Sequence, residues 1–258
     1  MASLPQFGLD GQVFIVTGAG RGIGRVIAQD AFRSGAKLAV GSRTTSELET
    51  LAKEIEGAGG ECFFHPLDVA DVQSIETFMQ AVISHYGRID VLVNNAGYNN
   101  QAKLVDYSEE EYDNIMDTNL KSVFFCSQVA TRQMIAQGDG GAIINISSQA
   151  GVIGAPMRGI YSGAKGGVNN LTRTMAAEWA EHSIRVNAVA PTVTRSPLSE
   201  QALGENPDWA ETIRTHNLLR RDLAEPEEIS APVIFMASKA ASMITGHTLV
   251  VDGGWTIV

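Results

Sequence analysis

The 258-residue chain contains very little cysteine. Cys62 and Cys126 are the two present, and each stands beside phenylalanine in an apolar segment. Such placement is typical of small buried side chains, so neither a disulfide nor a catalytic thiol is predicted. The histidines do not pair with cysteine or acidic residues at metal-ligand spacing; they stand at positions 65, 85, 182, 216 and 247. We therefore expect no catalytic metal.

Positive charge is also scarce. The chain has 19 lysine and arginine residues against 29 acids, a formal net charge of −10, which opposes binding to nucleic acid or to an anionic membrane. No apolar run approaches the length of a membrane span, and the segment from Met1 to Phe7 lacks the charged and apolar regions of a signal peptide. We expect a cytoplasmic protein that binds neither nucleic acid nor membrane.

Short β-rich runs alternate with amphipathic helical patterns along the chain. The predicted strands are 13–16, 37–41, 62–66, 89–93, 142–146, 184–189 and 248–251. A helical pattern begins near Arg25, and further ones cover 46–56, 71–86, 109–135 and 163–181. This alternation predicts parallel strands joined by right-handed helical crossovers. We therefore predict an α/β fold, a doubly wound seven-stranded parallel sheet in one domain spanning residues 1–258.

A glycine-rich segment, TGAGRGIG from Thr17 to Gly24, separates the first strand from the first helix. Glycine has no Cβ, so the backbone there can approach a ligand closely. The N-terminus of the following helix favours an anionic group such as a pyrophosphate. An ordinary tight turn can have the same composition, so this segment alone leaves nucleotide binding open.

Residues from about 194 to 222 interrupt the alternation of strands and helices. The stretch is mostly polar, with Leu203, Trp209 and Leu218 among its few large apolar residues. Ligands of open α/β sheets bind beyond the carboxyl ends of the strands. A long excursion after the sixth strand therefore predicts a substrate lid or pocket, with a plain surface insertion as the alternative.

Tyr161 and Lys165 stand four residues apart, a spacing that places both on one face of a helix. An ammonium group near a phenol stabilises the phenolate and lowers the phenol pKa, which would make the tyrosine usable as an acid or base near neutral pH. Taken alone, the pair is more typical of a packed tyrosine and a solvated lysine.

Further motifs complete an ordered set with the glycine turn and this pair: Asn94-Asn95-Ala96-Gly97 after the fourth strand, Asn119, Ser148, and Pro191 after the sixth strand. The whole set resembles the short-chain dehydrogenase/reductase family, and the resemblance spans essentially the entire chain. It implies a Rossmann-type sheet in the order 3-2-1-4-5-6-7, a nicotinamide cofactor and a homotetramer.

The resemblance also implies roles for individual residues. Tyr161 would be the general acid/base, and Ser148 would hydrogen-bond the same substrate oxygen. Lys165 would lower the pKa of Tyr161 and hold the nicotinamide ribose, while Asn119 would hold a water that links Lys165 to solvent. The implied cofactor-binding residues are Gly18, Arg21, Gly22, Ile23, Gly24, Ser42, Arg43, Asp68, Val69, Asn95, Ala96, Gly97, Tyr161, Lys165, Pro191, Thr194 and Ser196, with Asp68 on the adenine amino group. The implied substrate-binding residues are Ser148, Ala150, Arg158, Tyr161 and Trp209.

One position departs from the family pattern. The family usually has Pro-Gly after the sixth strand, whereas this chain has Pro191-Thr192. A threonine side chain there changes the shape of the pocket beside the nicotinamide.

The end of the second strand predicts a preference for NADP(H). An acid at this point would bind the ribose 2′-hydroxyl of NAD, but the strand ends Val40-Gly41-Ser42-Arg43, and the next acid is Glu47. Arg21 and Arg43 resemble the pair that binds the 2′-phosphate in NADP-preferring members, and guanidinium groups suit phosphate oxygens. We expect no acid to compete at that end of the site.

These features predict an NADP(H)-dependent oxidoreductase that interconverts a ketone and a secondary alcohol on a small polar substrate such as a polyol or sugar. The alternative is a 3-oxoacyl-carrier-protein reductase. Members of that group present basic residues to an acidic carrier, whereas the corresponding positions here are Asp139 and His182, and the negative net charge opposes docking. A non-catalytic NADP-binding regulator is a second alternative, but it would not need the complete set of Ser148, Tyr161 and Lys165.

Overall fold

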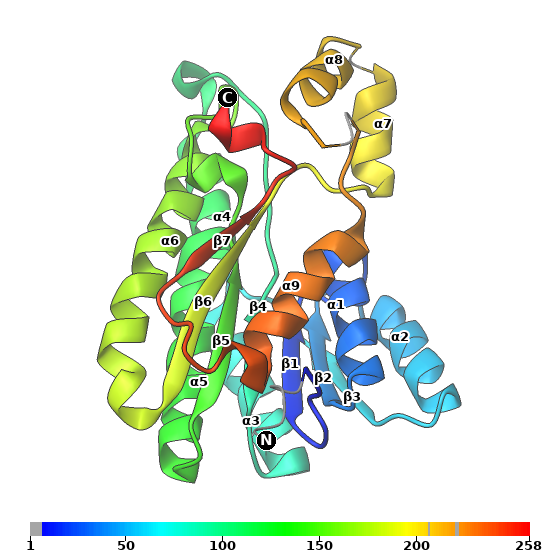
Figure 1. Ribbon diagram of the computed structural model, residues 1–258, viewed down its shortest axis with the longest axis vertical. Coiled ribbons are helices and arrows are strands. Elements are labelled where there is room, and N and C mark those ends of the chain that lie inside the picture. The colour runs from blue at the N-terminus through cyan, green and yellow to red at the C-terminus, as the bar shows by residue number, and fades with distance from the viewer. Residues whose placement is uncertain (1–6, 206, 220–221) are drawn as a thin grey trace, which may run out of the picture.

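The structure is a computed structural model that describes residues 7–205, 207–219 and 222–258. Positions 1–6, to which the signal-peptide prediction applies, lie outside that description, as do positions 206 and 220–221 of the predicted excursion. The described chain forms a parallel sheet in the order β3-β2-β1-β4-β5-β6-β7 (Figure 1). Its strands are β1 (Val13–Thr17), β2 (Lys37–Ser42), β3 (Cys62–Pro66), β4 (Val91–Asn94), β5 (Gly141–Ile146), β6 (Ile184–Pro191) and β7 (Thr248–Val251). The predicted fold class, strand number and strand order are confirmed.

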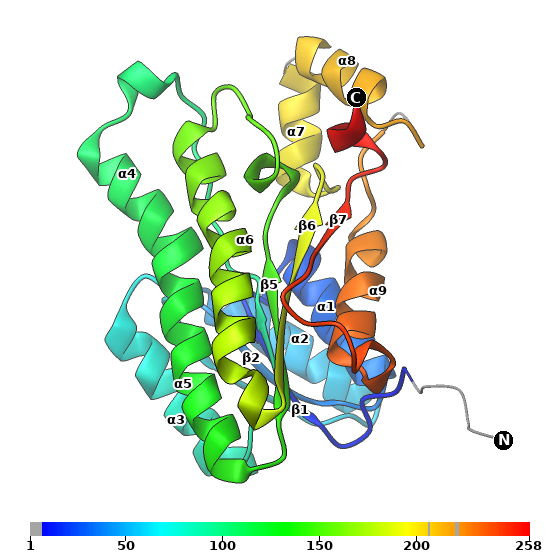
Figure 2. The same cartoon turned by 60° about the vertical axis from the view of Figure 1, so that its left-hand side comes forward.

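Helices cover both faces of the sheet (Figures 1 and 2). One layer consists of α1 (Gly22–Arg33), α2 (Thr45–Gly57) and α9 (Pro226–Ala237); the other consists of α3 (Val72–Tyr86), α5 (Ser122–Gln137) and α6 (Gly159–Trp179). Successive residues of a strand point to opposite faces, so Phe14 and Val16 of β1 pack into the first layer and Val13 and Ile15 into the second. Each layer therefore has its own apolar core.

The predicted helix over 109–135 is continuous, but its winding changes in the middle. It begins as α4 (Glu109–Met116), where Ser108 and Glu111 form a capping box that satisfies free backbone N–H groups. A π-helical turn, η2 (Asp117–Lys121), then leads into α5. Such turns are rare and frequently mark functional sites; this one contains Asn119.

The excursion after β6 forms two helices, α7 (Pro197–Glu205) and α8 (Pro207–His216), which lie beyond the carboxyl ends of the strands (Figure 1). A small apolar cluster joins α8 to the C-terminal segment through Ile213, Leu223 and Trp255. Shorter helical turns are η1 (Leu104–Asp106), η3 (Gln149–Gly151), η4 (Ala180–His182), η5 (Lys239–Ala241) and η6 (Trp255–Ile257). In the part of the chain that is described, no helix combines the length and apolar character needed to cross a membrane.

Candidate active site

The glycine turn after β1 is packed directly against the end of β4. Gly18 has a φ of +68°, which disfavours other residues, and a Cβ on it would lie 2.9 Å from the Ala96 Cα. Thr17 Oγ1 accepts hydrogen bonds of 3.1 Å from the backbone N–H groups of Asn95 and Ala96. The turn and the NNAG segment therefore form one rigid wall.

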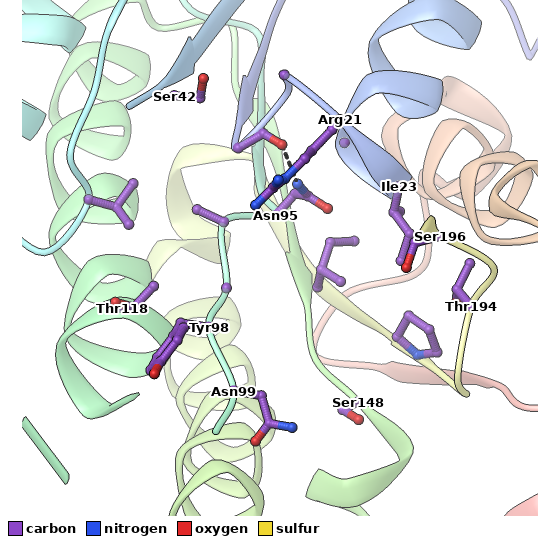
Figure 3. A pocket seen from close by; sticks show the side chains of 18 of the residues that line it. Arg21, Ile23, Ser42, Asn95, Tyr98, Asn99, Thr118, Ser148, Thr194 and Ser196 are labelled. Carbon is purple, nitrogen blue, oxygen red and sulfur yellow. Dashed lines mark hydrogen bonds between the residues drawn. The ribbon is translucent and has the colours of Figure 1, made fainter. Parts of the chain in front are cut away.

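The Asn95 side chain adds a second set of hydrogen bonds between the NNAG segment and the glycine turn. Its Nδ2 donates to the carbonyl oxygens of Thr17 at 3.0 Å and Gly18 at 3.1 Å, and Figure 3 shows the amide directed into the turn. A Cβ on Gly24 would collide with the same amide. The neighbouring Asn94 instead points into the core, where its Nδ2 donates to Ser127 and Asn145.

A cavity of about 460 Å³ runs along the carboxyl ends of the strands. In Figure 3, Ser42 lies at one end of it, Ser148 and Asn99 lie at the other, and Arg21 and Asn95 lie between. The predicted site residues that line it are Gly18, Arg21, Ile23, Gly24, Ser42, Arg43, Asp68, Val69, Asn95, Ala96, Gly97, Ser148, Tyr161, Lys165, Pro191, Thr194 and Ser196. Gly22, Asn119, Ala150, Arg158 and Trp209 are outside the lining.

Arg43 directly follows Ser42 at that end of the cavity, and Arg21 lines the cavity as well. The prediction that no acid lies at this end is wrong, because Glu47 from the first turn of α2 also lines it. The Glu47 carboxylate and the Ser42 hydroxyl both lie against Gly20, where a Cβ would meet each of them. The crossover from β2 to α2 is short enough to return this side chain to the strand end.

Tyr161 and Lys165 both lie in the first half of α6, as their spacing predicts. Lys165 is 3% exposed, its Nζ donates to the Ile146 carbonyl oxygen at 2.8 Å, and it lies 5.6 Å from the centroid of the Tyr161 ring. Burial lowers the pKa of Lys165 to about 8, because a low-dielectric environment disfavours the charged form.

Ser148 ends the loop after β5 and faces the same helix. Its Oγ accepts a 3.2 Å hydrogen bond from the Ala150 backbone N–H. Burial raises the pKa of the Tyr161 phenol, and the nearby Ser148 hydroxyl opposes this only in part. The expected lowering of this pKa by Lys165 is not seen in this structure, since burial dominates and Lys165 donates to Ile146 instead.

Asn119 lies behind the cavity in the π-helical turn. Its Nδ2 donates to the carbonyl oxygens of Tyr98 at 2.6 Å and Ile115 at 2.8 Å. A Cβ on Gly97 would lie 3.1 Å from Asn119 Oδ1 and 3.8 Å from Lys165 Nζ. Asn119 therefore flanks the same glycine as Lys165 and fixes the Tyr98 backbone directly after the NNAG segment.

The segment after β6 closes the cavity opposite the glycine turn. Thr192, the residue that departs from the family pattern, is buried and lines the cavity. Its carbonyl oxygen accepts from the Thr194 hydroxyl at 3.1 Å. Thr194 pairs with Ala224 in an isolated parallel bridge, and the Ser196 hydroxyl is within 3.1 Å of Ser199. These bonds hold the backbone at the start of the excursion.

The predicted substrate residues Arg158 and Trp209 come together at the edge of the site. The Arg158 guanidinium lies 4.6 Å from the centroid of the Trp209 ring, a cation–π arrangement that joins the start of α6 to α8. Ala150 is buried in η3 behind Ser148.

Some lining residues were not among the predicted site residues, including Thr44, Glu47, Thr118 and Arg195. Glu47 and Thr44 belong to the crossover after β2, whose length was visible in the sequence. The sequence around Arg195 did not predict its three ion pairs, because the fold brings Glu200, Asp222 and Glu225 to it from different parts of the chain.

Known proteins match this chain over almost its entire length. A family model described as Enoyl-(Acyl carrier protein) reductase matches residues 18–256. A 3-oxoacyl-(acyl-carrier-protein) reductase of Thermotoga maritima is 37% identical over 96% of this chain and 99% of its own. A 2-dehydro-3-deoxy-D-gluconate 5-dehydrogenase of Escherichia coli is 35% identical over 98% of both chains.

The structure has equally close counterparts. A gluconate 5-dehydrogenase of Burkholderia cenocepacia, solved in complex with NADP and tartrate, superposes with a TM-score of 0.93 at 32% identity and with 100% of both chains covered. The motifs, the strand order and these similarities agree: the chain belongs to the short-chain dehydrogenase/reductase family.

Proposed function

We propose that the protein is an NADP(H)-dependent oxidoreductase that interconverts a ketone and a secondary alcohol on a small polar substrate, such as a polyol, a sugar or a related carbonyl compound. The observation that carries this proposal is the convergence of Ser148, Tyr161 and Lys165 on one end of a cavity. Arg43, next to Ser42 at the opposite end, and Arg21, between the two ends, line the same cavity (Figure 3).

The cavity fits a dinucleotide with a 2′-phosphate. A Cβ on Gly18 would collide with the backbone of Ala96, so the close packing of the two strand ends depends on that glycine. None of the ion pairs formed by the described residues includes Arg21 or Arg43, which leaves both guanidinium groups available for phosphate oxygens. Asp68 and Val69 line the side where the adenine would lie. When bound, NADPH supplies the hydride.

The side chains of the chain itself handle the proton and the orientation of the substrate. Tyr161 donates its phenolic proton to the carbonyl oxygen during reduction and takes a proton from the alcohol during oxidation. Its raised pKa keeps the phenol protonated at neutral pH, which suits reduction. Ser148, which lines the cavity with Tyr161, holds the same oxygen. Lys165 returns the proton to Tyr161, and Asn119 orders the path from Lys165 to solvent.

The polar character of the substrate end favours a hydrophilic substrate. Tyr98 and Asn99 line the cavity near Ser148 (Figure 3). Dehydrogenases of sugar acids are among the similar proteins. These groups offer hydrogen bonds that a steroid-like ketone would leave unpaired.

A 3-oxoacyl-carrier-protein reductase is the second candidate, and the Thermotoga maritima relative favours it. Two surface features oppose docking of an acidic carrier. Asp139 is an acid, and it pairs with Arg88 at 3.3 Å, which offsets the positive charge of that exposed arginine. His182 lies 3.9 Å from Glu181. With a net charge of −10, the surface would repel a second acidic protein.

We also propose that residues 194–222 form a lid within a single NADP-binding domain. Arg195, at the base of α7, pairs with Glu200, Asp222 and Glu225 at 2.8–3.0 Å. This network ties the two ends of the excursion together, so α7 and α8 can move as one body over the substrate. Protection of this segment from hydrogen exchange should rise on substrate binding to the holoenzyme, while protection of the sheet stays constant.

A homotetramer in the cytoplasm completes the proposal. An apolar hollow on the outer layer is lined by Phe124 and Phe125 of α5 and by Leu171 of α6, and Phe124 is 39% exposed. A second copy covering this hollow would remove the rings from water. Light scattering should then give about four times the subunit mass of 27.5 kDa.

The activity is tested with a panel of ketones, polyols and sugar acids, each with NADP(H) and NAD(H), followed at the nicotinamide absorbance. Tyr161→Phe should lower kcat by about 10² or more while NADPH binds with unchanged affinity, because general acid/base catalysis acts on the transition state. Tight NADPH binding without turnover of any compound would instead indicate the regulatory alternative.

A further inference from the structure

Arg158 lies between the catalytic helix and the lid. It immediately precedes α6 and stands three residues before Tyr161. Its guanidinium lies over the ring of Trp209, 4.6 Å from the centroid. Figure 2 shows α8 at the same end of the molecule as the start of α6. The cation therefore lies beside the end of the cavity that holds Tyr161, just outside the lining.

No carboxylate of the described chain neutralises Arg158. Burial lowers the pKa of its guanidinium, which also interacts electrostatically with the phenols of Tyr161 and Tyr107. Arg195, by contrast, forms ion pairs with three acids near the same end of the molecule. A guanidinium that is partly withdrawn from water without an acid is suited to bind an anion that arrives with a ligand.

The turn that presents Arg158 is conformationally unusual. Met157 has a φ of +65°, in the left-handed region that residues other than glycine rarely adopt. Its carbonyl oxygen accepts from the Ala102 N–H at 3.0 Å and from the Tyr107 hydroxyl at 3.3 Å. Strained backbone that the surroundings hold in place is concentrated at functional sites. These bonds fix the direction in which Arg158 leaves the backbone.

We propose that the substrate carries a carboxylate that binds the guanidinium of Arg158, so that the physiological substrate is a short hydroxy or oxo acid of the sugar-acid type. This inference rests on the proposed function and adds the charge of its substrate. Arg158 determines specificity, with the carboxylate at one end of the substrate and the reacting oxygen on Ser148 and Tyr161. A protein with a net charge of −10 repels small anions at long range, and a local cation offsets that repulsion.

The first test compares six-carbon sugar acids with polyols of the same length and configuration, such as D-gluconate and D-glucitol. The parent enzyme should favour an acid over its polyol by at least about 10-fold in kcat/KM. Arg158→Met should lower kcat/KM for the acid by about 10- to 100-fold, mostly through KM, since one charge-assisted contact is lost. Its kcat/KM for the polyol should change by less than about 3-fold. Arg158→Lys should retain part of the preference.

Arg214→Met is the matched control, because Arg214 lies on α8 and pairs with Glu211 on the surface. It should leave the preference unchanged. A second readout does not depend on turnover: calorimetric titration of tartrate, a small dicarboxylate, into the holoenzyme. Arg158→Met should weaken tartrate binding by about 10-fold or more, with Arg214→Met equal to the parent.

Each other outcome has a definite meaning. An enzyme that oxidises polyols but no acid, and whose parent form does not bind tartrate, refutes the anion site and leaves the proposed function standing. An Arg158→Met variant that loses acid and polyol turnover equally shows that Arg158 only packs the lid. Turnover of neither class by the parent, with other ketones reduced, refutes the inference and the substrate class together. Should Arg158→Met fail to fold, Arg158→Lys and tartrate binding by the parent decide.

Discussion

The choice between NADPH and NADH depends on opposing charges at the Ser42 end of the cavity. Arg43→Leu removes a cation that lines this end without an ion pair among the described residues. A charge-assisted hydrogen bond contributes about 1.5–3 kcal/mol, so kcat/KM for NADPH should fall by about 10- to 100-fold. NADH lacks the phosphate, and its kcat/KM should change by less than about 3-fold.

Glu47 should act in the opposite direction. Its carboxylate lies against Gly20 beside the Ser42 hydroxyl, on the wall shared with the two arginines. Two unit charges about 4 Å apart repel by about 1 kcal/mol when water screens them. Glu47→Gln should therefore raise the NADPH/NADH ratio of kcat/KM by about 5-fold. The same variant should weaken NADH binding, because it removes a carboxylate that can accept a hydrogen bond from the ribose 2′-hydroxyl of NADH.

The assay measures kcat/KM and the dissociation constant for both cofactors in the parent and each variant, at low and at high salt. Arg33→Leu serves as the control, since Arg33 ends α1 far from the cavity and pairs with Asp30. Ser42→Asp combined with Arg43→Leu should invert the preference. An equal loss for NADPH and NADH in Arg43→Leu, or a double variant that favours NADPH as strongly as the parent, would refute this account.

Three further predictions concern buried charges. Because burial raises the Tyr161 pKa, the rate of ketone reduction should persist to alkaline pH and fall once Tyr161 loses its proton, while the rate of alcohol oxidation should rise with pH. Rate–pH profiles of opposite slope would support the role of Tyr161 as the acid/base, and parallel profiles would contradict it. Lys165→Met should raise the free energy of unfolding by about 1–3 kcal/mol at pH 7, because the buried ammonium group destabilises the folded parent. Burial lowers the pKa of Lys165 from 10.5 to about 8, so between these pH values the unfolded chain binds more protons than the folded one. The parent gains stability with rising pH in that interval, so urea titrations should show the difference fading from pH 8 to 10.5, and a constant difference would refute it. Arg185→Met should lower stability by about 2–4 kcal/mol without changing kcat, because Arg185 donates to the Met236, Ala237 and Ser238 carbonyl oxygens at the end of α9; a variant as stable as the parent would contradict this.

The strands of the sheet and the shared helix of Tyr161 and Lys165 were predictable because both follow from local patterns, whereas the strand order was implied by the family resemblance. Buried parallel strands are continuous apolar runs, and a spacing of four residues means one helical face wherever a helix forms. Boundaries were less exact: α6 begins at Gly159 rather than near 163, and β4 begins at Val91 rather than 89. Those ends depend on packing that a local pattern does not contain.

The electrostatics of the site could not be predicted from the same patterns. The pKa of Tyr161 depends on how deeply the phenol is buried and on where Lys165 points, and both are tertiary properties. The position of Glu47 against Gly20 depends on the angle at which α2 leaves β2. Arg158 was identified from the sequence, but its contact with Trp209 of α8 joins residues 51 positions apart.

The unpaired cations of the site explain how an acidic protein can bind an anionic cofactor and would also bind the anionic substrate that we propose. Elsewhere in the described chain several arginines pair with acids, as Arg88 does with Asp90, and Arg185 donates instead to the backbone carbonyl oxygens of Met236 and Ala237. Along the cavity, Arg43 has no such partner although Glu47 lies in the same wall, and Lys165 is buried without an acid. Leaving a partly buried cation unpaired destabilises the protein, so the arrangement makes physical sense where a ligand supplies the missing charge. Arg158 meets the same description at the far end, and for that reason we assign an anion to the substrate as well as to the cofactor.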